Sequence, residues 1–170
     1  MLDGGTNAGV MKLMGQARAE ANGDFPLIGV AAVGTVAAPD ANLTCTGATP
    51  LEPHHTHFVL IPGNRWGDES PWLGRTAAVL AGGAPSVTVL VNGGETSGED
   101  VYQSVSAGRP VVVVGGSGRI ADDLAAALAG ESTDGRFEEL VASGLLQGIA
   151  WPGPSDTLTG AVEKILAPKE

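Results

Sequence analysis

The feature that most constrains the fold of this chain is a change of hydrophobic period between residues 111 and 128. Residues 111–114 are four consecutive valines without apolar–polar alternation, which is typical of a strand buried on both faces of a parallel sheet. Ile120, Leu124 and Leu128 then repeat every four residues and predict a helix with one apolar face. The stretch therefore predicts a strand, a tight turn and a helix in succession.

The turn between this strand and helix has the composition of an anion-binding loop. Residues 115–118 read Gly-Gly-Ser-Gly, and glycine permits positive φ and a close approach of the backbone to a ligand. Ser117 is placed to cap the helix, whose first N–H groups and partial positive charge attract an anion. Arg119 adds a guanidinium that can hold a phosphate with two hydrogen bonds. The alternative is an ordinary turn followed by a surface arginine.

A strand followed by glycines occurs at three further places in the chain. Glycines follow Leu2 and Val91, and a looser version of the pattern follows Ile61. Strands that alternate with helices predict an α/β fold with a parallel sheet and right-handed crossovers. Because all these turns follow the carboxyl ends of strands, we expect them to lie along one edge, where open α/β sheets bind ligands. Four converging glycine turns favour a phosphate-bearing nucleotide as the ligand.

The remaining segments continue the alternation of strands and helices. Strands are predicted at residues 25–33, 86–91 and 148–151. Helices are predicted at residues 10–21, 137–146 and 155–166, the last with Ser155 as its cap. Residues 35–53 have no steady periodicity and predict a long irregular loop of the kind that often forms a ligand wall.

Length and charge limit the class of protein. A chain of 170 residues is long enough for one domain with a full core, which we expect to comprise residues 1–170. The formal net charge of −10 opposes binding to nucleic acid or to an anionic membrane. A small anion can still bind, because local N–H groups and one or two arginines determine that contact. No apolar run could span a bilayer and Cys45 is the only cysteine, so we expect a cytoplasmic protein.

All three histidines fall within residues 54–57, at the start of a predicted strand. His55 and His57 are two residues apart and are expected to share one face of that strand. Together with Glu52 or Cys45 they could form a zinc site, although no other residues have metal-ligand spacing. The simpler interpretation is that the histidines hydrogen-bond the backbone or a ligand at the edge of the sheet.

The turn at residues 62–72 is rich in functional groups. Arg65 could contact a phosphate and Trp66 could stack on a ring, while Glu69 could accept a ribose hydroxyl or transfer a proton. The alternative is structural, with Asp68 and Glu69 complementing the dipole in the first turn of a helix.

Four motifs in this order resemble those of a known family. They read Asp-Gly-Gly-Thr-Asn-Ala-Gly-Val at residues 3–10, His-Thr-His-Phe at 55–58, Trp-Gly-Asp-Glu at 66–69 and Val-Val-Val-Gly-Gly-Ser-Gly-Arg-Ile-Ala-Asp at 112–122. Together they resemble the prokaryotic LSDAT family of the SLOG superfamily, and they are similar to the N-terminal homology region of the melastatin-type TRP channels. The resemblance extends from residue 2 to residue 128. It implies a Rossmann-like open parallel sheet with helices on both faces.

The resemblance also implies a ligand and the residues that hold it. The ligand would be a nucleotide derivative of the ADP-ribose, cyclic ADP-ribose, NAD or AMP class, bound by a sensor or carrier domain. Carried over to this sequence, the residues that hold the phosphates are Gly4, Gly5, Thr6, Asn7, Gly116, Ser117, Gly118 and Arg119. The other candidate ligand-binding residues are Gly9, His57, Gly63, Arg65, Gly67, Glu69, Gly93 and Gly94.

A catalytic function is the alternative. Gly67 and Glu69 fall where the related lonely-guy phosphoribohydrolases have Pro-Gly-Gly-x-Gly-Thr followed by a catalytic Glu. Glu69 would then be the acid–base group of an N-glycosidic hydrolase acting on a nucleoside 5′-monophosphate. This sequence departs from that pattern, because residues 64–66 read Asn-Arg-Trp and no Gly-Thr precedes the acid. A third interpretation, a scaffold whose glycines serve only packing, does not explain a guanidinium at a helix start.

The family usually has a strand and a helix ahead of its Gly-Gly-Thr turn, whereas this sequence begins at that turn. We therefore expect the first strand–helix unit to be missing. Either the N-terminus is truncated or the open sheet edge is covered by something else, for which a second copy in a homo-oligomer is one candidate.

Overall fold

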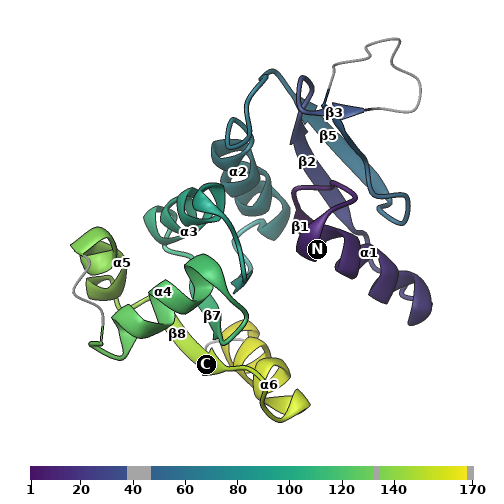
Figure 1. The fold of residues 1–170 in the computed structure, drawn as a ribbon. Helices are drawn as coiled ribbons and strands as arrows, with labels where there is room; N and C mark the ends of the chain where they lie inside the picture. Colours follow the sequence, from purple (N-terminus) through teal and green to yellow (C-terminus); the bar gives the residue numbers. More distant parts are fainter. Residues whose placement is uncertain (38–46, 132–134, 168–170) are drawn as a thin grey trace. The chain divides into compact units, whose positions relative to one another are not determined.

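A computed structural model describes residues 1–37, 47–131 and 135–167. The chain divides into two compact units, Met1–Arg75 and Thr76–Glu170. Each unit contains a three-stranded sheet whose strands are all parallel, accompanied by helices (Figure 1). The predicted α/β class with parallel strands is therefore confirmed. That residues 1–170 form one domain stays a prediction.

The sheet of the first unit has the strand order β1-β2-β5. Its elements are β1 (Leu2–Asp3), α1 (Gly9–Glu20), β2 (Ile28–Ala32) and β5 (His57–Ile61). The buried core of the sheet consists of Val30, Ala32 and Ile61, and Leu2 and Leu73 pack against it. β2 begins later than the predicted strand, because Pro26 has no N–H to donate to a ladder.

The loop predicted for residues 35–53 contains a second, two-stranded sheet. β3 (Val36–Ala37) pairs in parallel with β4 (Thr49–Pro50), and Leu51 forms an antiparallel bridge with Thr6. The prediction of an irregular loop is thus wrong within residues 35–37 and 47–53. Strands of two residues are too short to produce a periodic signal in the sequence.

The sheet of the second unit has the strand order β6-β7-β8. Its strands are β6 (Thr88–Val91), β7 (Val111–Gly115) and β8 (Leu146–Ala150). The helices are α3 (Glu95–Ser106), α4 (Arg119–Leu128), α5 (Glu138–Ala142) and α6 (Ser155–Leu166), while α2 (Ser70–Ala81) crosses the boundary between the units. Among the described helices of either unit, none is long and apolar enough to cross a membrane.

β7 is buried on both faces, as its valine run predicts. Val111 and Val113 pack into a core with Leu124 of α4. Val112 and Val114 face the opposite side of the sheet and are also buried. The predicted succession of strand, turn and helix is confirmed, and it places residues 115–118 at the carboxyl end of the central strand.

The carboxy-terminal predictions need correction. The helix predicted for residues 137–146 is a 3₁₀ turn (Gly135–Phe137) followed by the short α5, and Leu146 already belongs to β8. Gly144 has a φ of +68°, which ends the helix because only glycine adopts this conformation without cost. The predicted cap is also wrong, because Pro154 occupies the N-cap position of α6 and residue 155 is already helical.

Candidate functional site

The turn between β7 and α4 is the first part of the candidate site. Gly116 and Gly118 have φ values of +87° and +104°, so glycine is required at both positions. Gly118 is the N-cap residue of α4, and no side chain there bonds to the helix start. The predicted cap by Ser117 is therefore wrong. Its hydroxyl instead accepts a hydrogen bond of 2.7 Å from the N–H of Asn92.

Asn92 joins the turn after β6 to the turn after β7. Its Nδ2 donates to the carbonyl of Ser117 at 2.9 Å, and its own carbonyl accepts from the N–H of Ala121 at 3.0 Å. Its φ of +57° is unusual for a residue other than glycine. The sequence pattern identifies only Gly93 and Gly94 in this segment as candidate site residues, although an asparagine directly before two glycines is a recognisable signal for positive φ.

Arg119 reaches from the turn after β7 to the turn after β6. A Cβ placed on Gly94 would lie 3.5 Å from Nη2 of Arg119, and Gly94 is the N-cap residue of α3. Arg119 is exposed, and within the described residues it has no hydrogen bond or ion pair. A guanidinium and the positive end of a helix dipole thus lie together without a bonded anion.

Asp122 of α4 already bonds part of the turn after β7. Its Oδ1 accepts from the N–H of Gly116 at 2.7 Å and from the N–H of Gly118 at 2.9 Å. Two donors that the sequence offers to a phosphate therefore have an internal acceptor. In the described part of the chain nothing accepts from the N–H groups of Ser117 and Arg119, which are open to a ligand.

The end of β8 lies against the other side of this turn. The N–H of Trp151 donates to the carbonyl of Gly115 at 2.6 Å, and a Cβ on Gly116 would overlap the Trp151 carbonyl oxygen. The indole of Trp151 is 58% exposed. An exposed aromatic ring beside this glycine turn offers a surface on which a base could stack. Sequence reasoning missed Trp151, because nothing local connects residue 151 to the glycine turn.

In the first unit, the turn after β1 approaches β2 closely. Gly5 has a φ of +66°, and a Cβ there would overlap the β2 backbone. Helix α1 begins at Gly9 with Ala8 as its N-cap residue, so neither Thr6 nor Asn7 caps it. Asn7 is exposed, whereas the Thr6 hydroxyl is buried and has no hydrogen-bond partner among the described residues.

A buried histidine holds this turn through a neighbouring carboxylate. His55 Nε2 lies 2.7 Å from Asp3 Oδ1, and His55 Nδ1 lies 2.8 Å from Glu52 Oε2. Asp3 Oδ1 also accepts from the N–H of Gly5 at 2.7 Å. Each ring nitrogen therefore faces a carboxylate oxygen, and an imidazolium can donate to both. Sequence reasoning considered Glu52 as a metal ligand, and His55 as a metal ligand or as a hydrogen-bonding partner of the backbone or a ligand, but it connected neither with Asp3.

His57 lies elsewhere than its neighbour. It is exposed at the amino end of β5, where its Nδ1 lies 2.8 Å from Thr56 Oγ1, whereas His55 precedes the strand and is buried. The prediction that the two share one face is therefore wrong, because residue 55 is not part of the strand. The structure does not bring His57 to the turn at the carboxyl end of β5.

The turn after β5 is bonded by two carboxylates that precede α2. Asp68 Oδ2 accepts from the N–H groups of Asn64 at 3.0 Å and Arg65 at 3.1 Å. Glu69 is buried, and its Oε2 accepts from the N–H of Gly67 at 3.0 Å. Both acids thus bond the turn itself, and neither lies within the first turn of α2.

The structure distributes the predicted residues over both units. In the second unit it brings together Gly93, Gly94, Gly116, Ser117, Gly118 and Arg119. In the first unit, Gly4, Gly5, Thr6, Asn7 and Gly9 follow β1, while Gly63, Arg65, Gly67 and Glu69 follow β5 of the same parallel sheet. That all four turns lie along one edge stays a prediction.

The buried Arg109 of the second unit lies away from these turns. Burial lowers the pKa of Arg109, which precedes the amino end of β7 and donates from Nε to Ser86 Oγ at 3.1 Å. Within residues 1–37, 47–131 and 135–167, no cluster of three or more His, Cys, Asp or Glu is arranged to hold a metal ion. Cys45, considered as a zinc ligand, lies outside the described residues.

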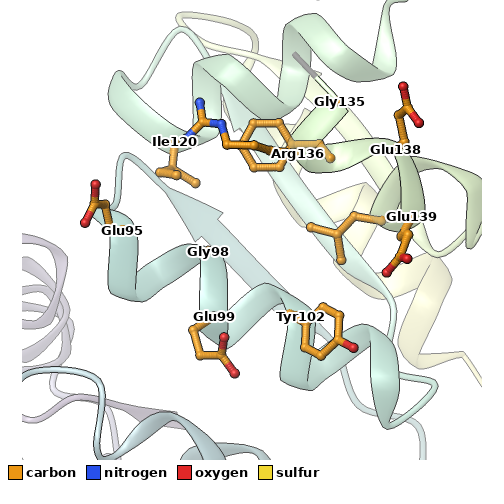
Figure 2. A pocket seen from close by; sticks show the side chains of 11 residues that line it. Glu95, Gly98, Glu99, Tyr102, Ile120, Gly135, Arg136, Glu138 and Glu139 are labelled. Atoms are coloured by element: carbon orange, nitrogen blue, oxygen red, sulfur yellow. The ribbon is translucent and has the colours of Figure 1, made fainter.

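A pocket of about 570 Å³ lies in the second unit and is lined by residues of α3, by Ile120 of α4 and by residues 135–140. Figure 2 shows Glu95, Glu99 and Tyr102 of α3 on one side, and Arg136 and Glu139 on the other. Glu138 also lines it, so the described lining contains four glutamates and one arginine. The centroid of the Phe137 ring lies 5.1 Å from the guanidinium carbon of Arg136. The excess of negative charge disfavours a phosphate there, so this pocket is not part of the candidate site.

Known proteins resemble this chain in sequence and in fold. The family model described as SLOG in TRPM, prokaryote, matches residues 1–159. Transient receptor potential cation channel subfamily M member 2 of Rattus norvegicus and of Mus musculus are each 28% identical over 160 residues, covering 74% of this chain. The chain spans only 11% of the length of either channel.

Among solved structures, the X-ray structure of TM1055, a target of the Northeast Structural Genomics Consortium, has a TM-score of 0.62. The similarity covers 96% of this chain and 77% of that one at 20% sequence identity, which supports the fold alone. Because the family model extends over almost all of the sequence and the four motifs lie at strand ends, the chain belongs to the family SLOG in TRPM, prokaryote.

Proposed function

We propose that this protein binds a phosphate-bearing nucleotide derivative of the ADP-ribose or NAD-related class, as a sensor or carrier. The ligand phosphates would contact the turns after β6 and β7, where Arg119 would neutralise their charge. A reducing, cytoplasmic location is in keeping with the single Cys45.

One observation carries this proposal. The guanidinium of Arg119 lies against Gly94 at the positive end of α3, and neither group has a bonded anion in the described part of the chain. A phosphate between them would interact with both positive groups and with the N–H groups of Ser117 and Arg119. The φ of +53° at Arg119 supports a role in binding, since strained residues concentrate at ligand sites.

A thermal-shift panel tests the proposal directly. ADP-ribose, cyclic ADP-ribose, NAD, AMP and inorganic phosphate would each be added to the purified protein. A ligand that binds only the native state stabilises it by about 2.7 kcal/mol at a hundredfold excess over Kd. No rise in Tm with any of the five compounds would contradict the proposal.

Arg119→Ala should weaken the binding of a phosphate-bearing ligand by about 1.5–3 kcal/mol, the usual range for a hydrogen bond to a charged group. The fold should persist, because Arg119 is exposed and bonds nothing within the described residues. Isothermal titration calorimetry measures the effect. Arg136→Ala is the control, since it removes the same charge from an exposed position outside the turns. Equal losses in the two variants would remove Arg119 from the site.

The hydrolase alternative depends on Glu69 and is tested separately. Its carboxylate bonds the N–H of Gly67, and a glutamine retains an oxygen that can accept this bond. We therefore expect Glu69→Gln to change ligand affinity by less than about threefold, and we expect no release of free base from AMP by the wild type. Base release that falls by about 10²-fold or more in Glu69→Gln, measured by chromatography, would support hydrolysis instead.

A further inference from the structure

Asp122 is the carboxylate that bonds the turn after β7. We infer that Asp122 is an internal anion that competes with the ligand for this turn, and that it selects phosphoryl groups over carboxylates. The inference rests on the proposed function, because it concerns the same turn. It starts from the two hydrogen bonds of 2.7 Å and 2.9 Å that Oδ1 accepts from Gly116 and Gly118.

Competition follows from the geometry of the donors. A phosphate that uses the N–H groups of Gly116 and Gly118 must first displace the carboxylate. If the carboxylate stays, its negative charge lies at the same turn and repels the phosphate. The helix dipole of α4 favours either anion at this position, so it does not decide between them.

Displacement is feasible at this turn because Asp122 is exposed. Its carboxylate can rotate into water, where it is fully solvated, without leaving a buried charge behind. Asp3 at the turn after β1 differs, because its Oδ1 is also bonded to the buried His55. The turn after β7 also has the guanidinium of Arg119, which can compensate for the charge of an incoming group.

The same competition makes the turn selective. The pyrophosphate of ADP-ribose carries about two negative charges, and a phosphate monoester such as AMP carries about −1.5 to −2 at pH 7 with three acceptor oxygens, whereas a carboxylate carries one charge. A free carboxylate such as acetate would only replace the carboxylate of Asp122, which already bonds the turn, so the exchange offers no gain in binding free energy. Phosphoryl groups can replace Asp122 by bonding Arg119 and the remaining N–H groups at the same time, and simple carboxylates cannot.

The test compares three proteins by isothermal titration calorimetry with ADP-ribose, inorganic phosphate and acetate. Asp122→Ala frees both N–H groups and should bind ADP-ribose about tenfold or more tightly than the wild type, with a detectable gain for acetate. Asp123→Ala removes the same charge from the adjacent residue, whose carboxylate is exposed and, among the described residues, makes a single ion-pair contact of 3.9 Å with Arg136. This control should change affinity by less than about threefold.

A second measurement keeps folding apart from binding. Asp122→Ala removes a carboxylate from the start of α4, so its Tm should fall by about 2–4 °C while its affinity rises. If Asp122 had a purely structural role, Asp122→Ala would lower both the Tm and the affinity for the ligand. Equal gains in Asp122→Ala and Asp123→Ala, or weaker binding in Asp122→Ala, would overturn the inference alone. If none of the three proteins binds ADP-ribose or inorganic phosphate, both the inference about Asp122 and the proposed function would be overturned.

Discussion

Gly116→Ala should destabilise the second unit by about 2–5 kcal/mol, the largest effect we expect from adding a methyl group to this chain. Two costs combine at this position. The φ of +87° costs an alanine about 1–2 kcal/mol. The new Cβ would also overlap the carbonyl oxygen of Trp151, which is backbone and cannot rotate away. The turn would have to move from the end of β8, breaking the bond between Trp151 N–H and the Gly115 carbonyl.

Gly130→Ala is the matched control for this prediction. Gly130 follows α4 and has a φ of +74°, but a Cβ there would have no atom of the described residues within 4 Å. Gly130→Ala should therefore lower the free energy of unfolding only by the conformational cost of about 1–2 kcal/mol. Urea denaturation followed by circular dichroism measures both variants. If the two lose the same stability, the carbonyl of Trp151 does not confine the turn.

The order of elements around β7 could be predicted because its signals are local. The valine run, the glycines and the four-residue repeat of Ile120, Leu124 and Leu128 all lie within one short stretch. Burial of Val112 and Val114 on one face and of Val113 on the other confirms the expected two-sided strand. The change from a continuous apolar run to a four-residue repeat is a reliable signal here, because glycines separate the two patterns.

The bonds that close the turns could not be predicted in the same way. The family resemblance assigns Gly116 and Gly118 to the phosphates, yet Asp122 accepts from both of their N–H groups. Asp68 likewise accepts from the N–H groups of Asn64 and Arg65 in the turn after β5. An acid near a helix start is favoured by the dipole in any case, so its presence does not reveal which donor it bonds. That choice depends on the backbone conformation of the turn, which residue type alone does not determine.

Contacts between distant residues were missed for a different reason. Asn92 bonds Ser117, and Asp3 bonds His55, across many intervening residues. Hydrophobic periodicity assigns elements and faces but does not pair polar side chains from separate elements. Both contacts nevertheless lie at strand ends that the glycine pattern identified, so the sequence located the turns but not the residues that hold them.

His55→Leu should reduce the stability of the first unit by about 3–5 kcal/mol, the cost of removing one partner from a buried charged group. His55 is buried between Glu52, which is 1% exposed, and Asp3. Leucine can occupy much of the space beside Phe58, whose ring stacks on His55 at 5.6 Å, but it donates no hydrogen bond. The buried carboxylate of Glu52 and the partly buried carboxylate of Asp3 would then lack their shared donor. Urea denaturation of the purified variant measures the loss.

Two further variants separate charge from packing. His54→Leu makes the same substitution at an exposed neighbour, whose backbone N–H donates to Glu52 and is retained, so stability should stay within about 0.5 kcal/mol. Glu52→Gln in the His55→Leu background neutralises one stranded carboxylate. The double variant should therefore be more stable than His55→Leu, since a neutral amide costs less to bury than a charge. A double variant less stable than His55→Leu would indicate that packing, and not the stranded charge, dominates at residue 55.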